Sequence, residues 1–294
     1  MIDTWGQFAG NFFHPKIGYS SDFRLLMKKN KKEKDSSETL REDAIFTRKN
    51  QSNQNSMQKL TDDWIVGFVD GDGCFKNSFV VSQNERSVSV LYALKNRFQC
   101  GSVNKAGGNM REYRVKRKED LKKYILPFFY HHPLQTLKWL DFKALYEDVY
   151  GIPLDKEKGP IQMTSDWIVG FSDAEGCFYT SFVKNYPRPQ FVIGLHPRDK
   201  EILMAIQSFL KMGTVYARSS ITNPCVIYQV SSHSSLILLM EIFMTHANKC
   251  LLRTTKRIAF LKFRQIIRLI EQKQHLTEKG IEKIRRIRKL YKTF

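Results

Sequence analysis

Two pairs of acidic residues stand out as candidates for chemistry: Asp70 with Asp72, and Asp173 with Glu175. The second acid of each pair, Asp72 or Glu175, is followed at once by a glycine that could end a helix. A carboxylate at a helix C-terminus is opposed by the helix dipole, and two such carboxylates brought together repel each other. A hard divalent cation removes both penalties and binds through oxygen ligands. We therefore expect Asp72 and Glu175 to hold Mg²⁺.

For a single acidic segment, the alternative is a capping or solvent-exposed carboxylate. Repetition argues against that alternative here. Residues 61–75 read TDDWIVGFVDGDGCF and residues 164–178 read TSDWIVGFSDAEGCF, with 11 of 15 positions identical at an offset of 103 residues. Internal repetition of this kind indicates two copies of one structural unit.

Each copy predicts a helix with small residues on one side. Gly67 and Gly71 are four residues apart, as are Gly170 and Ala174, so each pair shares a helical face. Glycine inside a helix costs roughly 1 kcal/mol relative to alanine, and a close backbone approach explains its presence. We expect the two helices to pack on each other around a pseudo-two-fold axis.

The residues after each copy repeat in kind as well. Strand patterns, a helix, a second strand pair, an apolar helix and a closing basic helix follow each motif, which gives two modules of the form αββαββα. The predicted pieces are Phe79–Val81, Val90–Phe98, Ser102–Asn104, Glu112–Val115 and Leu121–Phe129 in the first module, and Phe191–Ile193, Ile202–Phe209, Thr214–Ala217, Val226–Val230 and Ser235–Met244 in the second. The closing helices are predicted from His131 and Asn248, and Gly101 and Gly213 are predicted to stop the helices before them.

The predicted fold class is α+β, and the chain divides into four parts. Residues 1–59 form a basic, largely disordered extension, because residues 28–58 are mostly Lys, Asn, Ser, Gln and Glu. Residues 60–150 form the first module. A linker with two prolines occupies 151–163, and the second module, ending in a basic helix, occupies 164–294.

Composition limits the partners. The chain of 294 residues has 48 Lys and Arg against 29 Asp and Glu, a net charge of +19. Such a surplus favours a polyanion, with nucleic acid ahead of an anionic membrane surface. Five scattered cysteines with no CxxC pair argue against a zinc ribbon or a disulfide framework. The longest apolar stretch, near residues 236–244, contains Glu241 and is too short to span a bilayer, so we expect a soluble protein with no membrane partner.

The motifs themselves resemble a known family. Ile65–Gly73 (IVGFVDGDG) and Ile168–Gly176 (IVGFSDAEG) are similar to the two signature motifs of the LAGLIDADG homing endonucleases, and the similarity extends through most of residues 60–280. This resemblance implies a monomer in which paired motif helices pack the modules together and antiparallel sheets form a saddle over double-stranded DNA. It also implies site-specific, Mg²⁺-dependent hydrolysis of both DNA strands in intron homing.

The resemblance assigns roles around the motifs. The last acid of each motif binds the catalytic metals in this family, which implies metal roles for Asp72 and Glu175, together with the residues just before them, Gly71 and Ala174. No protein nucleophile is needed, since metal-bound phosphate and water carry the reaction.

Three further catalytic assignments and one comparison follow from the same resemblance. Lys138 and Lys256 match the family's basic active-site position, where a lysine could stabilise charge on the scissile phosphate or orient water. Their alternative is a simple phosphate contact or a solvated helix face. Gln83 matches a polar residue that orders solvent, and His196 is taken as its counterpart in the second module, where a phosphate contact is the other possibility.

The sheets are expected to read DNA, because a two-stranded ribbon fits the major groove. Taken singly, each candidate is more often a plain surface residue. The candidates are Lys76, Gln83, Lys105, Arg111, Arg114 and Lys116 in the first module, and Lys184, Arg188, Gln190, His196, Arg218 and Gln229 in the second.

The first repeat is shorter just after its motif. Phe178 to Phe191 is 13 steps, whereas Phe75 to Phe79 is only 4, so nine residues are missing where the family's first DNA-reading hairpin lies. We expect no strand pair in 76–78 and weaker recognition of one half-site.

Two other functions fit the same resemblance. One is a cleavage-deficient DNA-binding relative, and the other is an RNA maturase that binds its host intron RNA. One scaffold can carry several functions, so the fold alone does not choose among them. The Asn- and Lys-rich composition, with the family, indicates an organelle genome, in a chloroplast or a mitochondrion.

Overall fold

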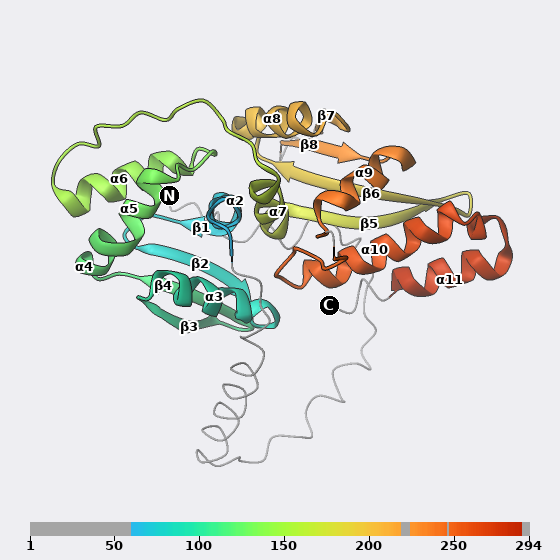
Figure 1. Ribbon diagram of the computed structural model, residues 1–294, viewed down its shortest axis with the longest axis horizontal. Helices are drawn as coiled ribbons and strands as arrows, with labels where there is room; N and C mark the ends of the chain where they lie inside the picture. The colour runs from blue at the N-terminus through green and yellow to red at the C-terminus, as the bar shows by residue number, and fades with distance from the viewer. Residues whose placement is uncertain (1–59, 219–223, 246, 290–294) are drawn as a thin grey trace, which may run out of the picture. The chain divides into compact units, whose positions relative to one another are not determined.

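The protein is described here by a computed structural model covering residues 60–218, 224–245 and 247–289. The predicted extension 1–59 lies outside these residues, as do the last five residues of the chain. Residues 60–294 form a unit of their own, and its strands make two four-stranded antiparallel sheets (Figure 1). Their orders, β1-β2-β4-β3 and β5-β6-β8-β7, are the same arrangement used twice. The predicted α+β fold with two pseudo-symmetric modules is confirmed.

The first module contains one sheet and its helices. In chain order its elements are α2 (Asp62–Asp72), β1 (Gly73–Cys74), β2 (Phe79–Asn84), η3 (Glu85–Ser87), α3 (Val88–Phe98), β3 (Ser102–Gly107), β4 (Met110–Val115), α4 (Lys118–Asp120), the π-helical turn η4 (Leu121–Ile125), α5 (Leu126–His131) and α6 (Lys138–Tyr150). The stretch 151–163 has no helix or strand, and the module boundaries drawn on either side of it stay a prediction.

The second module repeats this order and adds a helix. Its elements are α7 (Ser165–Glu175), β5 (Gly176–Val183), β6 (Tyr186–Leu195), η5 (Pro197–Asp199), α8 (Lys200–Leu210), β7 (Thr214–Arg218), β8 (Cys225–Val230), α9 (His233–Ile242), α10 (Lys256–Glu271), η6 (Gln274–Leu276) and α11 (Glu278–Lys289). No helix in the described ranges is long and apolar enough to cross a membrane.

The two motif helices, α2 and α7, begin and end in the same way. Thr61 and Thr164 cap their N-termini, each accepting a hydrogen bond from the backbone N–H three residues on. Gly73 and Gly176 end them by turning the chain directly into β1 and β5. The two helices lie side by side, each next to the first strand of its own sheet (Figure 1).

Strand alternation gives each sheet a buried face and a polar face. In the first sheet Phe79, Val81, Tyr113 and Val115 are fully buried beneath the helices, where Phe79 packs against other aromatic rings. The intervening residues of the same strands face away from the core. We call this second side the polar face of the sheet.

The hairpins that start the two sheets differ in length, as the sequence predicted. β1 pairs with β2 through two residue pairs, whereas β5 pairs with β6 through eight, from Gly176↔Ile193 to Val183↔Tyr186. The longer hairpin closes through Lys184 and Asn185, both at positive φ. Residues 76–78 form a short connection with no strand of their own.

The C-terminal helix supports the longer hairpin. Ile284 and Ile287 of α11 are buried against α10, and Phe182 from β5 joins the same apolar cluster. The guanidinium groups of Arg285 and Arg288 lie over the Phe182 ring, 5.7 and 5.3 Å from its centroid. The basic helix predicted at the end of the second module is therefore a packed helix.

Two sequence predictions about helix ends were wrong. Helices α3 and α8 end at Phe98 and Leu210. Their C-caps, Gln99 and Lys211, take the left-handed conformation themselves, and Gly101 and Gly213 lie two residues beyond these caps. The closing helices begin at Lys138 and Lys256 rather than at His131 and Asn248. In both modules the residues before the closing lysine form a loop, because a buried carboxylate binds their backbone.

Candidate active site

The motif helices touch backbone to backbone. A Cβ atom added at Gly67 would fall inside contact distance of the Trp167 carbonyl oxygen, and one added at Gly170 would do the same at the Trp64 carbonyl. One at Gly71 would overlap Ala174. The small residues are therefore explained by close helix packing, and this packing brings the two helix C-termini together.

The inner acids, Asp72 and Glu175, are the last residues of these helices. The Glu175 side chain lies against Gly71, the neighbour of Asp72, since a Cβ there would be 3.2 Å from Glu175 Cγ. Burial, and then the nearby Glu175 carboxylate, raises the pKa of Asp72 to about 7. Burial also raises the pKa of Glu175. The two carboxyl groups thus share one desolvated site, as the spacing of the motifs predicted.

Two lysines face the same acids. Lys138 and Lys256 are the first residues of α6 and α10, and both oppose the upward pKa shifts of Asp72 and Glu175. The Lys138 ammonium donates to the carbonyl oxygens of Gly71 and, at 3.4 Å, of Val69. The Lys256 ammonium donates to the carbonyl oxygen of Ala174.

The outer acids, Asp70 and Asp173, have a different task. Asp70 accepts hydrogen bonds from the backbone N–H groups of Gln135 and Thr136, both at 2.9 Å, and from the Thr136 hydroxyl at 2.7 Å. A fourth donor is the indole N–H of Trp167, at 2.9 Å. Burial raises the pKa of Asp70, and these four bonds act in the opposite direction.

Asp173 does the same in the second module. It accepts from the backbone N–H of Arg253 at 2.6 Å, and from the backbone N–H and hydroxyl of Thr254 at 3.1 and 2.7 Å. The hydroxyls of Thr136 and Thr254 in turn accept from the backbone N–H groups of Lys138 and Lys256. Each outer acid therefore fixes the loop that presents a lysine to the inner acids.

Sequence reasoning gave these outer acids no role of their own. Their partners in the loops before the closing helices lie 65 to 66 and 80 to 81 residues further along the chain, beyond the reach of any local pattern. A signal was nevertheless present: each closing helix has a threonine two residues before its lysine, and each motif has an acid two residues before its last acid.

Gln83 contacts the inner acid of its own module, and its role in ordering solvent stays a prediction. Its side-chain amide donates to Asp72 Oδ2 from the end of β2. The pairing of His196 with Gln83 was wrong, however. Val81 and Ile193 both face the glycine that ends their motif helix, so Leu195 is the counterpart of Gln83.

His196 instead matches Asn84. Each of these two side chains caps the short helix that follows, accepting a hydrogen bond from the backbone N–H of Arg198 or Arg86. Among the described residues of the second module, no side-chain amide is bonded to Glu175, so the site is unequal in its two halves.

The candidate DNA-binding residues fall into three groups. Arg114, Arg188, Gln190, Arg218 and Gln229 occupy the positions of the polar faces. Lys105 and Arg111 form a cross-strand pair on the opposite side, where Tyr113 also lies, and Arg111 is 4.0 Å from Glu85. Lys76 and Lys116 are exposed next to β2 and β4, and Lys184 lies in the turn of the long hairpin. The sequence treated these residues as one surface, and strand alternation separates them.

The donor set suits a hard divalent cation. Two carboxylates and the carbonyls of Gly71 and Ala174 are all oxygen donors, and the carboxylates carry a like-charge and desolvation penalty that a cation would relieve. The described residues hold no cluster of three or more His, Cys, Asp or Glu side chains, so main-chain oxygens, phosphate or water would complete the coordination.

Comparison with known proteins agrees with this architecture. The family model described as LAGLIDADG endonuclease matches residues 65–149 and 168–267. The chain belongs to the LAGLIDADG endonuclease family.

The chain is also similar to individual relatives and to a solved structure. The chain is 31% identical over 157 residues to a probable intron-encoded endonuclease, Cox1-I1b of Schizosaccharomyces pombe, which covers 40% of each protein. It is 26% identical over 231 residues to probable intron-encoded endonuclease 4 of Neurospora crassa, covering 72% of this chain and 41% of the relative. The chain thus spans about two fifths of the length of these two relatives. The fold matches the I-LtrWI LAGLIDADG homing endonuclease, solved bound to target DNA, with a TM-score of 0.68 at 21% identity over 77% of this chain and 96% of that one.

Proposed function

We propose that this chain is a site-specific endonuclease that cuts both strands of double-stranded DNA in intron homing, by Mg²⁺-dependent phosphodiester hydrolysis. The observation that carries the proposal is the meeting of Asp72 and Glu175 at the ends of two packed helices, faced by two lysines. The net charge of +19 and the relatives named as intron-encoded endonucleases support a DNA substrate.

In this proposal Asp72 and Glu175, with the carbonyl oxygens of Gly71 and Ala174, hold Mg²⁺. When bound, Mg²⁺ supplies charge neutralisation and Lewis acidity at the scissile phosphate. Lys138 and Lys256 stabilise the negative charge that develops on the phosphate during attack.

The remaining residues act around this centre. The Gln83 amide, already bonded to Asp72, orders water on its side of the site. Asp70 and Asp173 hold the lysine loops in place without touching the substrate. A single chain carries both motifs, so a monomer suffices.

An organellar gene fits the relatives. The relative from Schizosaccharomyces pombe is named Cox1-I1b, and a second protein from the same yeast is named for cox1 intron 2. We propose a mitochondrial intron as the source of the gene, and nothing in these names supports a chloroplast.

The direct test is cleavage of a duplex that carries the uninterrupted exon junction of the host gene, with Mg²⁺ or with a chelator. We expect the wild-type chain to cut both strands only with Mg²⁺, and Asp72→Asn and Glu175→Gln to bind the duplex without cutting it. Asp63→Asn, in the first turn of the same helix α2, is the matched control and should cut normally. Specific binding without cleavage by the wild-type chain would indicate a cleavage-deficient relative. Selective, splicing-competent binding of the host intron RNA would indicate a maturase.

A further inference from the structure

Two residues occupy equivalent places on the polar faces of the two sheets. Arg114 in β4 is paired with Val80, and Gln229 in β8 is paired with Val192. Those valines pair in turn with Cys74 and Cys177, each two residues after the inner acid of its module. Arg114 and Gln229 are therefore the same number of strand positions from Asp72 and Glu175.

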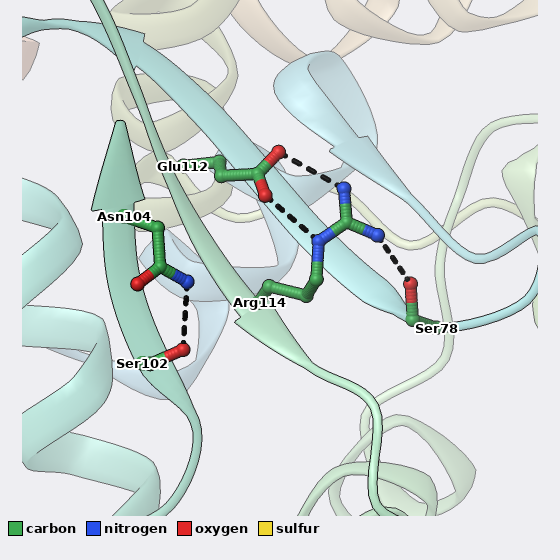
Figure 2. Close-up of polar contacts among 5 residues, drawn as sticks. All are labelled: Ser78, Ser102, Asn104, Glu112 and Arg114. Atoms are coloured by element: carbon green, nitrogen blue, oxygen red, sulfur yellow. Dashed lines mark hydrogen bonds and ion pairs between the residues drawn. The ribbon is translucent and has the colours of Figure 1, made fainter. Parts of the chain in front are cut away.

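Arg114 is held by its neighbours in one orientation (Figure 2). Its Nε and Nη2 donate to the two carboxylate oxygens of Glu112 at 2.8 and 3.0 Å, and its Nη1 donates to the buried Ser78 hydroxyl at 3.1 Å. A guanidinium carries five N–H donors, and these bonds use three. One N–H on Nη1 and one on Nη2 have no partner among the described residues.

Glu112 also determines which kind of acceptor the two remaining N–H groups of Arg114 can bind. Its carboxylate lies beside the guanidinium with only 17% of the side chain exposed, so the pair has little net charge. A phosphate oxygen approaching Arg114 would meet the Glu112 carboxylate and be repelled. Guanine O6 and N7 are neutral acceptors, and two N–H groups of one arginine match them.

The side chain of Gln229 is oriented by a different kind of neighbour, a tyrosine hydroxyl. The Tyr216 hydroxyl donates to Gln229 Oε1 at 2.7 Å from the adjacent strand β7, which fixes the orientation of the amide. The oxygen keeps a second lone pair, and the amide nitrogen donates to no residue in the described ranges. An amide with one free acceptor position and one free donor matches N6 and N7 of adenine.

We propose that Arg114 and Gln229 are specificity-determining residues that read base pairs at equal distances on either side of the cut, Arg114 a guanine and Gln229 an adenine. This inference rests on the proposed DNA endonuclease function. It makes Glu112, Ser78 and Tyr216 positioning residues, and it makes the target asymmetric at this pair of positions.

The test is selection from a pool of randomised double-stranded DNA, followed by sequencing of the bound duplexes. We expect the wild-type chain to enrich guanine at one position and adenine at the mirrored position. Arg114→Lys keeps the charge but loses the planar fork, so the guanine preference should fall by about 5- to 150-fold while preferences elsewhere persist. Glu112→Gln should weaken the same position, and Tyr216→Phe should weaken the adenine position alone.

Arg286→Lys is the matched control, because Arg286 is also paired with a glutamate, Glu282 at 2.7 Å, but on α11. It should leave every base preference unchanged. An Arg114→Lys protein that folds like the wild type, binds DNA and keeps the wild-type preferences at every position would overturn the inference while leaving the endonuclease proposal intact. A wild-type chain that enriches no sequence would overturn both.

Discussion

The indole Nε1 of Trp167 donates a hydrogen bond to Asp70 Oδ2 at 2.9 Å, so a side chain of the second motif helix completes the carboxylate site of the first module. The reciprocal bond is missing. Trp64 occupies the equivalent place in the first motif helix, and its Nε1 is buried without a hydrogen-bond partner among the described residues. The pseudo-two-fold relationship is therefore broken at one buried polar contact.

This difference predicts unequal effects of two matched substitutions. Trp167→Phe and Trp64→Phe remove the same atoms from buried positions, but only the first removes a hydrogen bond to a carboxylate. Such a bond contributes about 1.5–3 kcal/mol, so Trp167→Phe should lower the free energy of unfolding by that much more than Trp64→Phe. Thermal unfolding should show a difference in Tm of roughly 3 to 12 °C. Equal Tm values for the two variants would show that the Trp167 bond contributes nothing.

The raised pKa of Asp72 predicts how stability depends on pH. Its pKa is 3.8 in an ordinary environment and about 7 in the fold, so between these values the folded chain holds a proton that the unfolded chain has lost. The metal-free protein should therefore lose stability as the pH rises from about 4 to about 7, and the effect should level off above that.

Asp72→Asn removes the contribution of Asp72 to this dependence, because the amide does not titrate. In a chelator, the variant should become more stable than the wild type across the same window, by a difference on the order of 4 kcal/mol at most. Chemical unfolding of both proteins at several pH values measures that difference. A difference that stayed constant from about pH 4 to pH 8 would contradict the buried, titrating carboxylate.

Mg²⁺ should stabilise the fold in a pH-dependent way. The cation competes with the proton at Asp72, so the rise in Tm on adding Mg²⁺ should be larger near about pH 8 than near about pH 5. At 100 times its dissociation constant, a ligand that binds only the folded chain contributes about 2.7 kcal/mol. An Asp72→Asn, Glu175→Gln double variant should show no such rise, and a rise equal to that of the wild type would place the cation elsewhere.

The two lysines should matter for cleavage more than for binding. Lys138→Ala or Lys256→Ala removes a cation that faces the inner acids, so single-turnover cleavage should slow by about 100-fold or more. Lys143→Ala is the control on the same helix α6, since the Lys143 ammonium lies 3.9 Å from Glu147 and Lys143 is not among the groups that shift the pKa of Asp72 or Glu175. DNA affinity measured in Ca²⁺ should change little in all three. Equal cleavage rates for Lys138→Ala and Lys143→Ala would mean that Lys138 takes no part in catalysis and at most contacts a phosphate.

The parts of the fold that the sequence predicted are those governed by local pattern. The doubled motif gave both helices, and period-two alternation gave the strands, because each pattern depends on neighbours within a few residues. The closing helices began later than predicted because Asp70 and Asp173 bind the loops before Lys138 and Lys256, and that contact is non-local.

The site was predictable to the same extent. The meeting of Asp72 with Glu175 followed from repetition and small residues, whereas the support of Arg114 by Glu112 and Ser78 depends on strand register. Aligning the two modules by sequence across their nine-residue difference in length also misplaced the counterpart of Gln83 by one residue. A one-residue shift moves a side chain to the other face of a strand, so His196 and Leu195 have unrelated surroundings.

The short β1–β2 hairpin affects which host sequences the gene could enter. β5 and β6 have six more residue pairs than β1 and β2, a difference in reach of about 20 Å, or the rise of about six base pairs. Under the proposed function, the first module would contact fewer base pairs on its flank of the target than the second module does. Host lineages with exon changes on the flank contacted by the first module would still be cut and could still acquire the gene. Changes on the flank contacted by the second module would prevent cleavage.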